Sequence, residues 1–595
     1  MLKAFTYIST KYKVFAAFTA ILTFFQVVTD LIVPGMLGSL VNVIEPHNNK
    51  YELFFISREW TIEFDSANQL LLVCSLLMIG FSLLGILFGM VSVWLASKIA
   101  VEVARVTRNN LFQKIQTLSA SNISKFGTSS LITRLTNDVT QVQTNIIIML
   151  RLMIRAPFLF VGGLIFSIIT SLKLSISLAV MIPIMIVVIV ITSIFVMPLF
   201  RKNQKIIDSI NNESRENILG ARVVKSFNLE DAQKNKFFKI NNEWQVVSTK
   251  AFTIMNILLP IIMFITNMGM VVIVLIGKFM FESDLDKLKL LPEITTFSQY
   301  LGYVTSGLIM TVMVMVLVIR SRISWIRITD VLKDTPDIKK IVSDVKIETP
   351  SIEFNNVCFK YNKDSSEDVL SNITFSLRHG QTLGIIGPTG SGKSTLINLI
   401  SRVYEPQSGS IKIDSKELNT IDSINLNESV SQVLQESVLY SGTIKSNLLF
   451  GNLNASDEEI EWAIDIACAK QFIEKFDNKL DHVVEQRGKN LSGGQKQRLQ
   501  IARGIISKPK ILILDDSTSA LDALTDRTLR QNIKKHLKQT TTIIVAQKIN
   551  SIKDADKIIV LDKGKIIGYG NHGQLMKTCY MYKEIADSQL SMEEE

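Results

Sequence analysis

The chain has 595 residues, of which 47% are hydrophobic and only 20% are charged, and this composition excludes a wholly soluble protein with a single core. Basic loops beside anionic lipid account for the formal net charge of +10, so we predict no nucleic-acid partner.

Nearly all of the apolar excess lies before Arg320, in segments long enough to cross a bilayer, which takes about 20 residues. The six predicted spans are residues 14–44, 70–96, 146–170, 174–200, 251–280 and 297–319. Several exceed the minimum length, so we expect them to tilt or to continue into the cytosol as helices.

The loops between these spans predict their orientation. The long connections 97–145 and 201–250 are rich in Lys and Arg, whereas segments 45–68 and 281–293 are weighted towards Glu and Asp. By the positive-inside rule, the basic loops and both termini are cytoplasmic. We therefore expect a multi-pass protein of a cell membrane with its C-terminal domain in the cytoplasm.

Asp30, Arg151 and Arg155 are notable charged residues inside the apolar spans. An ionised carboxylate at Asp30 should face a cavity or a partner. We predict that Asp30 contacts substrate, with a structural hydrogen bond near Pro34 as the alternative. Arg151 and Arg155 begin the third span, where extension towards the cytoplasmic interface is the simpler interpretation.

A group of adaptable side chains marks the sixth span. They line an apolar cavity, or they pack against lipid and other helices. The group consists of Phe297, Tyr303, Met310, Met313 and Met315.

The composition changes after residue 320. We predict a transmembrane domain over 1–320, a polar linker over 321–349 and a soluble α/β domain over 350–595. In the last of these, 352–361 and 383–386 are predicted strands and 395–403 is a predicted helix. The second strand leads directly into the sequence GPTGSGKS and then into that helix, which is the context that a phosphate-binding loop requires.

The glycines of this loop allow backbone N–H groups to curl around phosphate oxygens at a helix N-terminus. We predict that Lys393 reaches the β- and γ-phosphates of ATP and that Ser394 binds Mg²⁺. The predicted nucleotide-binding residues of the loop are Gly387, Pro388, Thr389, Gly390, Ser391, Gly392, Lys393, Ser394 and Thr395.

Two later motifs strengthen the prediction. Residues 511–514 form a short apolar strand that ends at Asp515, which places a carboxylate for Mg²⁺ at a sheet edge. The sequence LSGGQKQR supplies a second helix N-terminus with a hydroxyl and bare backbone donors. Its predicted nucleotide contacts are Ser492, Gly493, Gly494 and Gln495.

With these motifs after six spans, the whole chain resembles a half-transporter of the ATP-binding cassette type, in the type IV exporter class. The resemblance implies a helical transmembrane domain with long cytoplasmic helical extensions, followed by an α/β P-loop domain with a helical signature subdomain. It also implies that Tyr361 stacks on adenine, that Gln435 assists catalysis and binds Mg²⁺, and that 519–522 form the D-loop.

The cytoplasmic segments near Arg134 and from Glu216 match the extensions that dock on the ATPase domains of such proteins. Their alternative interpretation is a pair of solvated basic helices.

Two catalytic positions depart from the family pattern. Asp516 stands where a catalytic Glu is expected, and Gln547 stands where a His is expected. Asp516 is shorter by one methylene, and a displacement of roughly 1 Å costs on the order of 10²-fold in rate. The departures resemble the degenerate site of heterodimeric exporters, so we predict a partner half-transporter with an intact Glu and His.

The predicted function is the ATP-driven export of amphipathic drugs or lipid-like compounds from a bacterial cytoplasm or inner leaflet. A lipid or peptide exporter, including a homodimeric one, is the alternative. A soluble cassette ATPase acting on DNA would share the nucleotide motifs but not the apolar spans.

Overall fold

The computed structural model describes residues 9–41, 43, 51–55, 61–283, 290–362 and 367–591. Its contacts divide the chain into two compact units. Unit 1 holds residues 1–115 and 129–333, and unit 2 holds 116–128 and 334–595. The boundary between the units, after residue 333, therefore falls inside the predicted linker 321–349. The first part of that predicted linker, up to Lys333, is helical.

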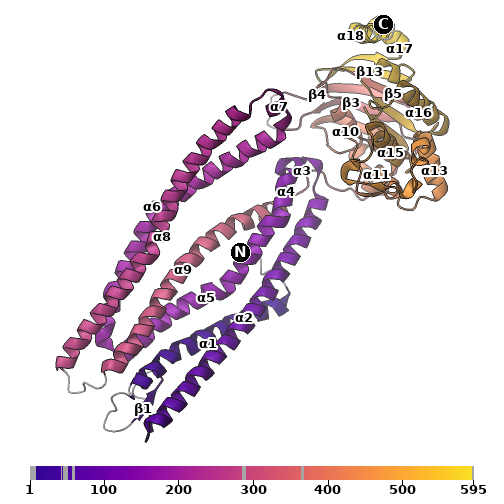
Figure 1. Ribbon diagram of the computed structural model, residues 1–595. Helices are drawn as coiled ribbons and strands as arrows, with labels where there is room; N and C mark the ends of the chain where they lie inside the picture. The colour runs from indigo at the N-terminus through magenta and orange to yellow at the C-terminus, as the bar shows by residue number, and fades with distance from the viewer. Residues whose placement is uncertain are drawn as a thin grey trace. The chain divides into compact units, whose positions relative to one another are not determined.

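Unit 1 is built from long helices and one small hairpin (Figure 1). A hairpin in which β1 and β2 pair antiparallel follows the first helix. The elements up to residue 333 are α1 Thr10–Val41, β1 Tyr51–Phe54, β2 Thr61–Phe64, α2 Ala67–Thr117, α3 Ala120–Phe126, α4 Thr128–Thr133, the π-helical turn η2 Arg134–Asp138, α5 Val139–Thr170, α6 Leu172–Leu219, α7 Ala221–Ser226, α8 Glu230–Ser283 and α9 Leu290–Lys333.

The helices are much longer than a bilayer is thick. With 51 residues, α2 extends for about 75 Å at 1.5 Å per residue, whereas the hydrocarbon core measures about 30 Å. The basic connections predicted between the spans are therefore largely continuations of the same helices.

Five helices are long and apolar enough to cross a membrane, within the part of the chain that the structure describes. They contain the first five predicted spans, except that the first helix ends at Val41 and residues 42 and 44 lie outside the described residues. The sixth predicted span, 297–319, lies on the helix α9, but the side chains of 315–321 are also outside the described set. The sixth crossing therefore stays a prediction.

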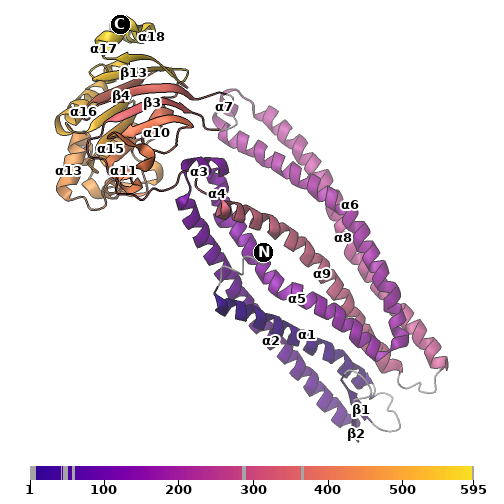
Figure 2. The same cartoon turned by 180° about the vertical axis from the view of Figure 1, so that it is seen from behind.

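In unit 1, helices that are not consecutive in the sequence pack side by side. Both views show α6 beside α8, and α5 runs with α9 while α1 contacts both of these (Figures 1 and 2). A buried cluster of Val27, Leu31, Leu159 and Tyr300 joins α1, α5 and α9. A second cluster fastens α9 to α6 and α8 through residues that include Phe297.

Unit 2 is an α/β domain with two main sheets. The larger has the order β14-β13-β5-β12-β11-β8, with β8, β11, β12, β5 and β13 parallel and β14 antiparallel at one edge. The smaller is antiparallel with the order β4-β3-β6-β7. The strands are β3 Ile352–Phe359, β4 Leu370–Leu377, β5 Thr382–Ile386, β6 Ser408–Ile413, β7 Lys416–Glu417, β8 Val430–Val433, β9 Gly442–Thr443, β10 Val483–Val484, β11 Ile511–Asp515, β12 Thr541–Val545, β13 Lys557–Asp562 and β14 Lys565–Gly570.

Central strands that are buried on both faces form near-continuous apolar runs, and both β11 and β12 are buried at every position. One hydrophobic cluster fills the space between the two sheets and α10, and another lies among the helices around α13 and α15. The α-helices are α10 Lys393–Ile400, α11 Ser423–Ser429, α12 Ile444–Leu449, α13 Asp457–Ile466, α14 Lys470–Ile473, α15 Gly493–Ile505, α16 Ala523–His536, α17 His572–Thr578 and α18 Tyr580–Ser591.

The short helix α3 belongs to unit 2 because Asn122 ties it to the segment after α9. The buried Asn122 amide donates to Asp334 at 2.8 Å and to the Thr335 carbonyl at 3.1 Å, and its oxygen accepts from the Asp337 N–H at 3.1 Å. Lys125 adds an ion pair to Asp334 at 3.3 Å. The helix α3 at the tip of the first cytoplasmic extension is thus held by the segment that follows α9.

Candidate functional site

The glycine-rich loop joins β5 to α10. Gly392 precedes α10 with a φ of 99°, a left-handed conformation that other residues disfavour. A Cβ atom at Gly387 would overlap the carbonyl oxygen of Leu561, so only glycine can pass this close to β13. The predicted helix begins two residues earlier than expected, at Lys393. The loop curls around the N-terminus of α10, where unpaired N–H groups attract anions.

Lys393 opens α10 and turns back along the loop. Its Nζ donates hydrogen bonds to the carbonyl oxygens of Gly387 and Pro388, each at 2.8 Å. Burial lowers the pKa of Lys393, and the nearby carboxylates of Asp516 and Asp515 oppose this shift. A cation is therefore placed between the loop and two acidic side chains.

Asp515 ends the buried strand β11. Ser394 Oγ donates to its carboxylate at 3.5 Å, so a hydroxyl and a carboxylate meet at the sheet edge. Burial raises the pKa of Asp515, although the hydrogen bond from Ser394 opposes the shift. Oxygen ligands of these two kinds suit Mg²⁺.

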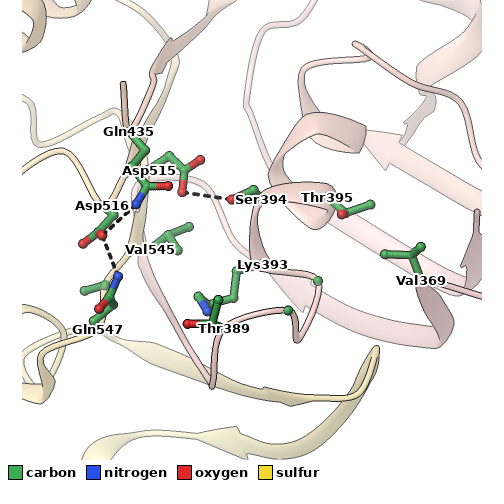
Figure 3. Close-up of a pocket in the computed structure, with 13 residues that line it drawn as sticks. Val369, Thr389, Lys393, Ser394, Thr395, Gln435, Asp515, Asp516, Val545 and Gln547 are labelled. Carbon is green, nitrogen blue, oxygen red and sulfur yellow. Dashed lines mark hydrogen bonds between the residues drawn. The ribbon is translucent and has the colours of Figure 1, made fainter. Parts of the chain in front are cut away.

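Asp516, Gln435 and Gln547 form one hydrogen-bonded group. Gln547 Nε2 donates to Asp516 Oδ2 at 2.9 Å, and Gln435 Nε2 donates to the same oxygen at 3.3 Å (Figure 3). Asp516 has a φ of 46°, which is unusual for a residue other than glycine. Burial raises the pKa of the Asp516 carboxyl and outweighs the hydrogen bonds from the two amides, which lower that pKa. The two residues that depart from the family pattern are thus direct partners.

These side chains line a pocket of about 290 Å³ (Figure 3). Most of the predicted residues from the loop and from the two strand ends reach it, whereas Gly387, Pro388 and Ser391 do not line it. The lining residues are Val369, Thr389, Gly390, Gly392, Lys393, Ser394, Thr395, Gln435, Asp515, Asp516, Val545, Ala546 and Gln547. The sequence analysis missed Val369, Val545 and Ala546. The last two immediately precede Gln547, whereas no sequence signal marks Val369.

Tyr361 stands just after β3 and beside this pocket. Its hydroxyl lies 3.0 Å from Thr395 Oγ1, and its ring meets those of Phe359 and Tyr404 edge-on. The side chain is 53% exposed. A face of the ring therefore remains accessible, and the stacking role on adenine stays a prediction.

The signature residues lie at the N-terminus of α15, away from this pocket. Ser492 caps the helix by accepting from the Gln495 N–H at 3.3 Å, and the Gln495 side chain accepts from the Ser492 N–H at 2.9 Å. Neither these two residues nor Gly493 and Gly494 belong to the pocket lining. Within one chain, the structure does not bring the two sets of motifs into one site.

Sequence reasoning also missed the link between α15 and the predicted D-loop. The buried Gln497 accepts from the Ala520 N–H at 3.0 Å, and its amide donates to Ser519 Oγ at 3.3 Å. Gln497 follows the signature by two positions, and its spacing carries no signal of this contact. Two hydrogen bonds therefore link the signature helix to the loop after Asp516.

In unit 1, Asp30 is paired. Arg155 Nη2 on α5 donates to Asp30 Oδ2 on α1 at 2.9 Å, and the two side chains are 28% and 27% exposed. The interpretation of Arg155 as an arginine reaching for the interface is therefore wrong, because its guanidinium is held by a carboxylate of another helix. The role of Asp30 towards substrate is untested by this contact.

The four described members of the predicted Met and aromatic group on α9 lie in different surroundings. Phe297 is buried against α6 and α8, whereas Tyr303 and Met310 pack on the cluster shared with α1 and α5. Met313 is 58% exposed, and the Met315 side chain lies outside the described set. Helix packing explains the first three of these residues.

Known proteins resemble this chain along nearly its whole length. The putative ABC transporter ATP-binding protein MG014 of Mycoplasma genitalium is 38% identical over 593 residues, covering 95% of each chain. YfiB of Bacillus subtilis, an ABC transporter ATP-binding protein, is 36% identical over 523 residues, or 87% of this chain and 89% of that protein. A solved bacterial Atm1-family ABC exporter with ATP bound has the same fold, with a TM-score of 0.78 over 97% of this chain and 98% of that one, at 22% identity.

The family comparisons divide the chain as the fold does. The family described as the ABC transporter transmembrane region matches residues 17–308, and the ABC transporter family of ATP-binding domains matches residues 370–519. The site geometry, the membrane-length helices and these matches agree. The chain belongs to the ABC transporter family, as a multi-pass membrane protein whose ATPase domain drives transport.

Proposed function

We propose that the chain is one subunit of a heterodimeric exporter and that its own loop and strand-end residues form the less active of two ATP sites. In this arrangement, each ATP lies between the phosphate loop of one subunit and the signature of the other. The chain contributes a weakened site of its own and an intact signature to its partner's site.

The hydrogen-bonded pair of Asp516 and Gln547 carries this proposal. A general base must accept a proton from the attacking water. Here the Asp516 oxygen already accepts from two amides, at 2.9 and 3.3 Å. The Gln547 amide is neutral and is held by Asp516, so it offers neither the charge nor the proton exchange of an imidazole. Both departures therefore weaken hydrolysis at the same place.

Binding of the nucleotide is supported by features that the departures leave intact. Lys393 provides the cation, and Ser394, Asp515 and Gln435 provide oxygen ligands for Mg²⁺. Bound Mg²⁺ would neutralise phosphate charge. We infer a site that holds ATP well and cleaves it slowly.

A partner chain is supported by the tip of the second cytoplasmic extension. Large apolar side chains crowd this tip at 55–76% exposure, and no residue of α7 is buried. Exposed apolar groups in such a cluster favour a protein contact. The exposed residues are Ile218, Leu219, Val223 and Phe227.

The proposed cargo is an amphipathic drug or a lipid-like compound, carried out of the cytoplasm or the inner leaflet of a bacterial plasma membrane. The relatives named above are bacterial, and the solved structure of similar fold is an exporter. A lipid or peptide exporter that works as a homodimer remains the second candidate, since the membrane helices fit it equally.

The test is turnover by the chain alone. Purified into lipid nanodiscs without a partner, it should hydrolyse ATP at a small fraction of the rate of the pair formed with a half-transporter that carries the Glu and the His. Dye export from proteoliposomes should show the same contrast. Robust hydrolysis and export by the isolated chain would remove the heterodimer and leave the homodimeric candidate.

A further inference from the structure

Three charged side chains form a cluster between α1 and α5. Arg151 and Arg155 are four residues apart on α5, so they share one face of the helix. Asp30 on α1 accepts the hydrogen bond from Arg155 at 2.9 Å. The cluster therefore holds two cations and one anion.

One cation of this cluster is left without compensation. Arg151 is half-buried and makes no ion pair or hydrogen bond within the described part of the chain. Arg155 Nε is also buried and has no acceptor among the described residues. Both arginines stand in a helix that is long and apolar enough to cross a membrane, where an unbalanced charge is expensive and points to a functional contact.

The cluster is partly exposed and lies beside apolar side chains. Asp30 and Arg155 keep 27% and 28% of their side-chain surface exposed. Tyr303 and Met310 of α9 pack on the neighbouring cluster of Leu31, Leu159 and Tyr300. A charged group and an apolar body could thus be accommodated side by side.

We propose that Arg151 and Arg155 bind the anionic group of the transported compound, a carboxylate or a phosphate. This inference rests on the proposed export of amphipathic compounds and narrows them to anionic ones. Guanidinium groups suit these anions because they offer planar, paired N–H donors. Asp30 then competes with the bound anion for Arg155, and a cationic substrate would have to displace that ion pair.

Three probes with one acyl chain test the charge. They are N-lauroylglycine as the anion, N-lauroylglycinamide as the neutral analogue and N-lauroylethylenediamine as the cation, each added to the protein in phosphatidylcholine nanodiscs. ATPase stimulation is measured on whichever assembly is active, the pair or the chain alone, so the result does not depend on the heterodimer. N-Lauroylglycine should stimulate at the lowest concentration.

The arginine variants show whether the cluster is responsible. Arg151→Gln should raise the half-maximal concentration of N-lauroylglycine about tenfold and leave that of the amide unchanged. Arg201→Gln, which removes an exposed arginine from α6, is the matched control and should change neither. Asp30→Asn should preserve or strengthen ATPase stimulation by N-lauroylglycine. If the cluster instead bound cations through Asp30, the same change would abolish stimulation by N-lauroylethylenediamine.

The lipid arm separates two sources of the anion. Stimulation by N-lauroylglycine in pure phosphatidylcholine supports a free amphiphile. Stimulation by added phosphatidylglycerol, lost in Arg151→Gln, supports a lipid headgroup at the same cluster.

Two results would overturn the inference. If the amine or the amide stimulates ATPase activity more than the acid, the anionic cargo is rejected but an amphipathic cargo is retained. If none of the three probes stimulates, both the anionic and the amphipathic cargo are rejected. If Arg151→Gln weakens every response equally and also reduces recovery of the dimer, Arg151 binds a carboxylate of the partner subunit instead.

Discussion

Unit 2 carries two helix N-termini suited to phosphate, and they differ in what surrounds them. The N-terminus of α10 faces Asp516 and Gln547, the two residues that depart from the family pattern. The N-terminus of α15 begins with Ser492, Gly493 and Gly494 and keeps its capping geometry intact. We call the first the Walker side and the second the signature side.

The difference separates binding from cleavage. On the Walker side, the loop, Lys393 and the paired Ser394 and Asp515 are all in place, and only the groups that would act on the attacking water are altered. On the signature side, the LSGGQ sequence at 491–495 matches the family pattern, although Gln486 ahead of it stands where the family usually has Glu. Under the proposed function, a chain organised in this way would retain its own nucleotide and support hydrolysis in a site completed by another chain.

The largest effect is expected from Gly493→Asp on the signature side. A Cβ atom at Gly493 would meet Ala520 Cβ at 3.6 Å, an ordinary contact, so the fold should tolerate the change. The added carboxylate would repel the phosphates at the partner's site, and ATP turnover of the pair should fall about 100-fold, as when a transition-state donor is lost.

Steady-state ATPase assays of the pair measure this effect. Asn454→Asp adds the same charge at an exposed position of unit 2 and should leave turnover unchanged. Normal turnover in Gly493→Asp would show that this signature does not complete an active site.

The next effect concerns retention of nucleotide on the Walker side. Lys393→Ala removes the only lysine that lines the described pocket. A hydrogen bond to a charged group contributes about 2 kcal/mol, so ATP should be held about 30-fold more weakly by this chain.

Photolabelling of this chain in the pair with an azido-ATP measures that retention. The matched control is Lys538→Ala, at an exposed position after α16. Unchanged labelling of Lys393→Ala would contradict a nucleotide site at this loop.

Restoring the family pattern should erase the difference between the two sides. The double change Asp516→Glu and Gln547→His lengthens the base and supplies an imidazole, so turnover by the chain alone should rise about tenfold. Gln547→His alone should raise it much less, because Asp516 remains too short.

ATPase rates of the isolated chain and its three variants, including Asp516→Glu alone, test this prediction. Equal rates in the double variant and the parent would mean that these two side chains do not limit hydrolysis.

Local order in the chain was enough to predict the nucleotide-binding loop. The strand, the glycines, Lys393 and the strand ending at Asp515 each follow from a short stretch of sequence, and the structure has them within two residues of the expected bounds. The helices that extend the spans followed from segment length and charge in the same manner.

Contacts between distant residues were beyond this reasoning. Gln435 and Gln547 meet at Asp516 across 81 and 31 residues, because β8, β11 and β12 are neighbours in the sheet. Arg155 and Asp30 are 125 residues apart. The sequence alone favoured an interfacial arginine since it contains no sign of which helices pack together.

The smallest effect should come from Asp516→Ala in the pair. The Walker side already lacks a well-placed base, so loss of this carboxylate should lower turnover of the pair less than about twofold, whereas removal of the partner's catalytic Glu should lower it about 100-fold. The change also removes the acceptor shared by Gln435 and Gln547. We therefore expect dye export per ATP hydrolysed to fall more than the ATPase rate itself. ATPase rate and dye export should be measured together in the two variants. Equal losses of ATPase rate would mean that the two sites work alike, and the contrast between the Walker side and the signature side would then have no functional meaning.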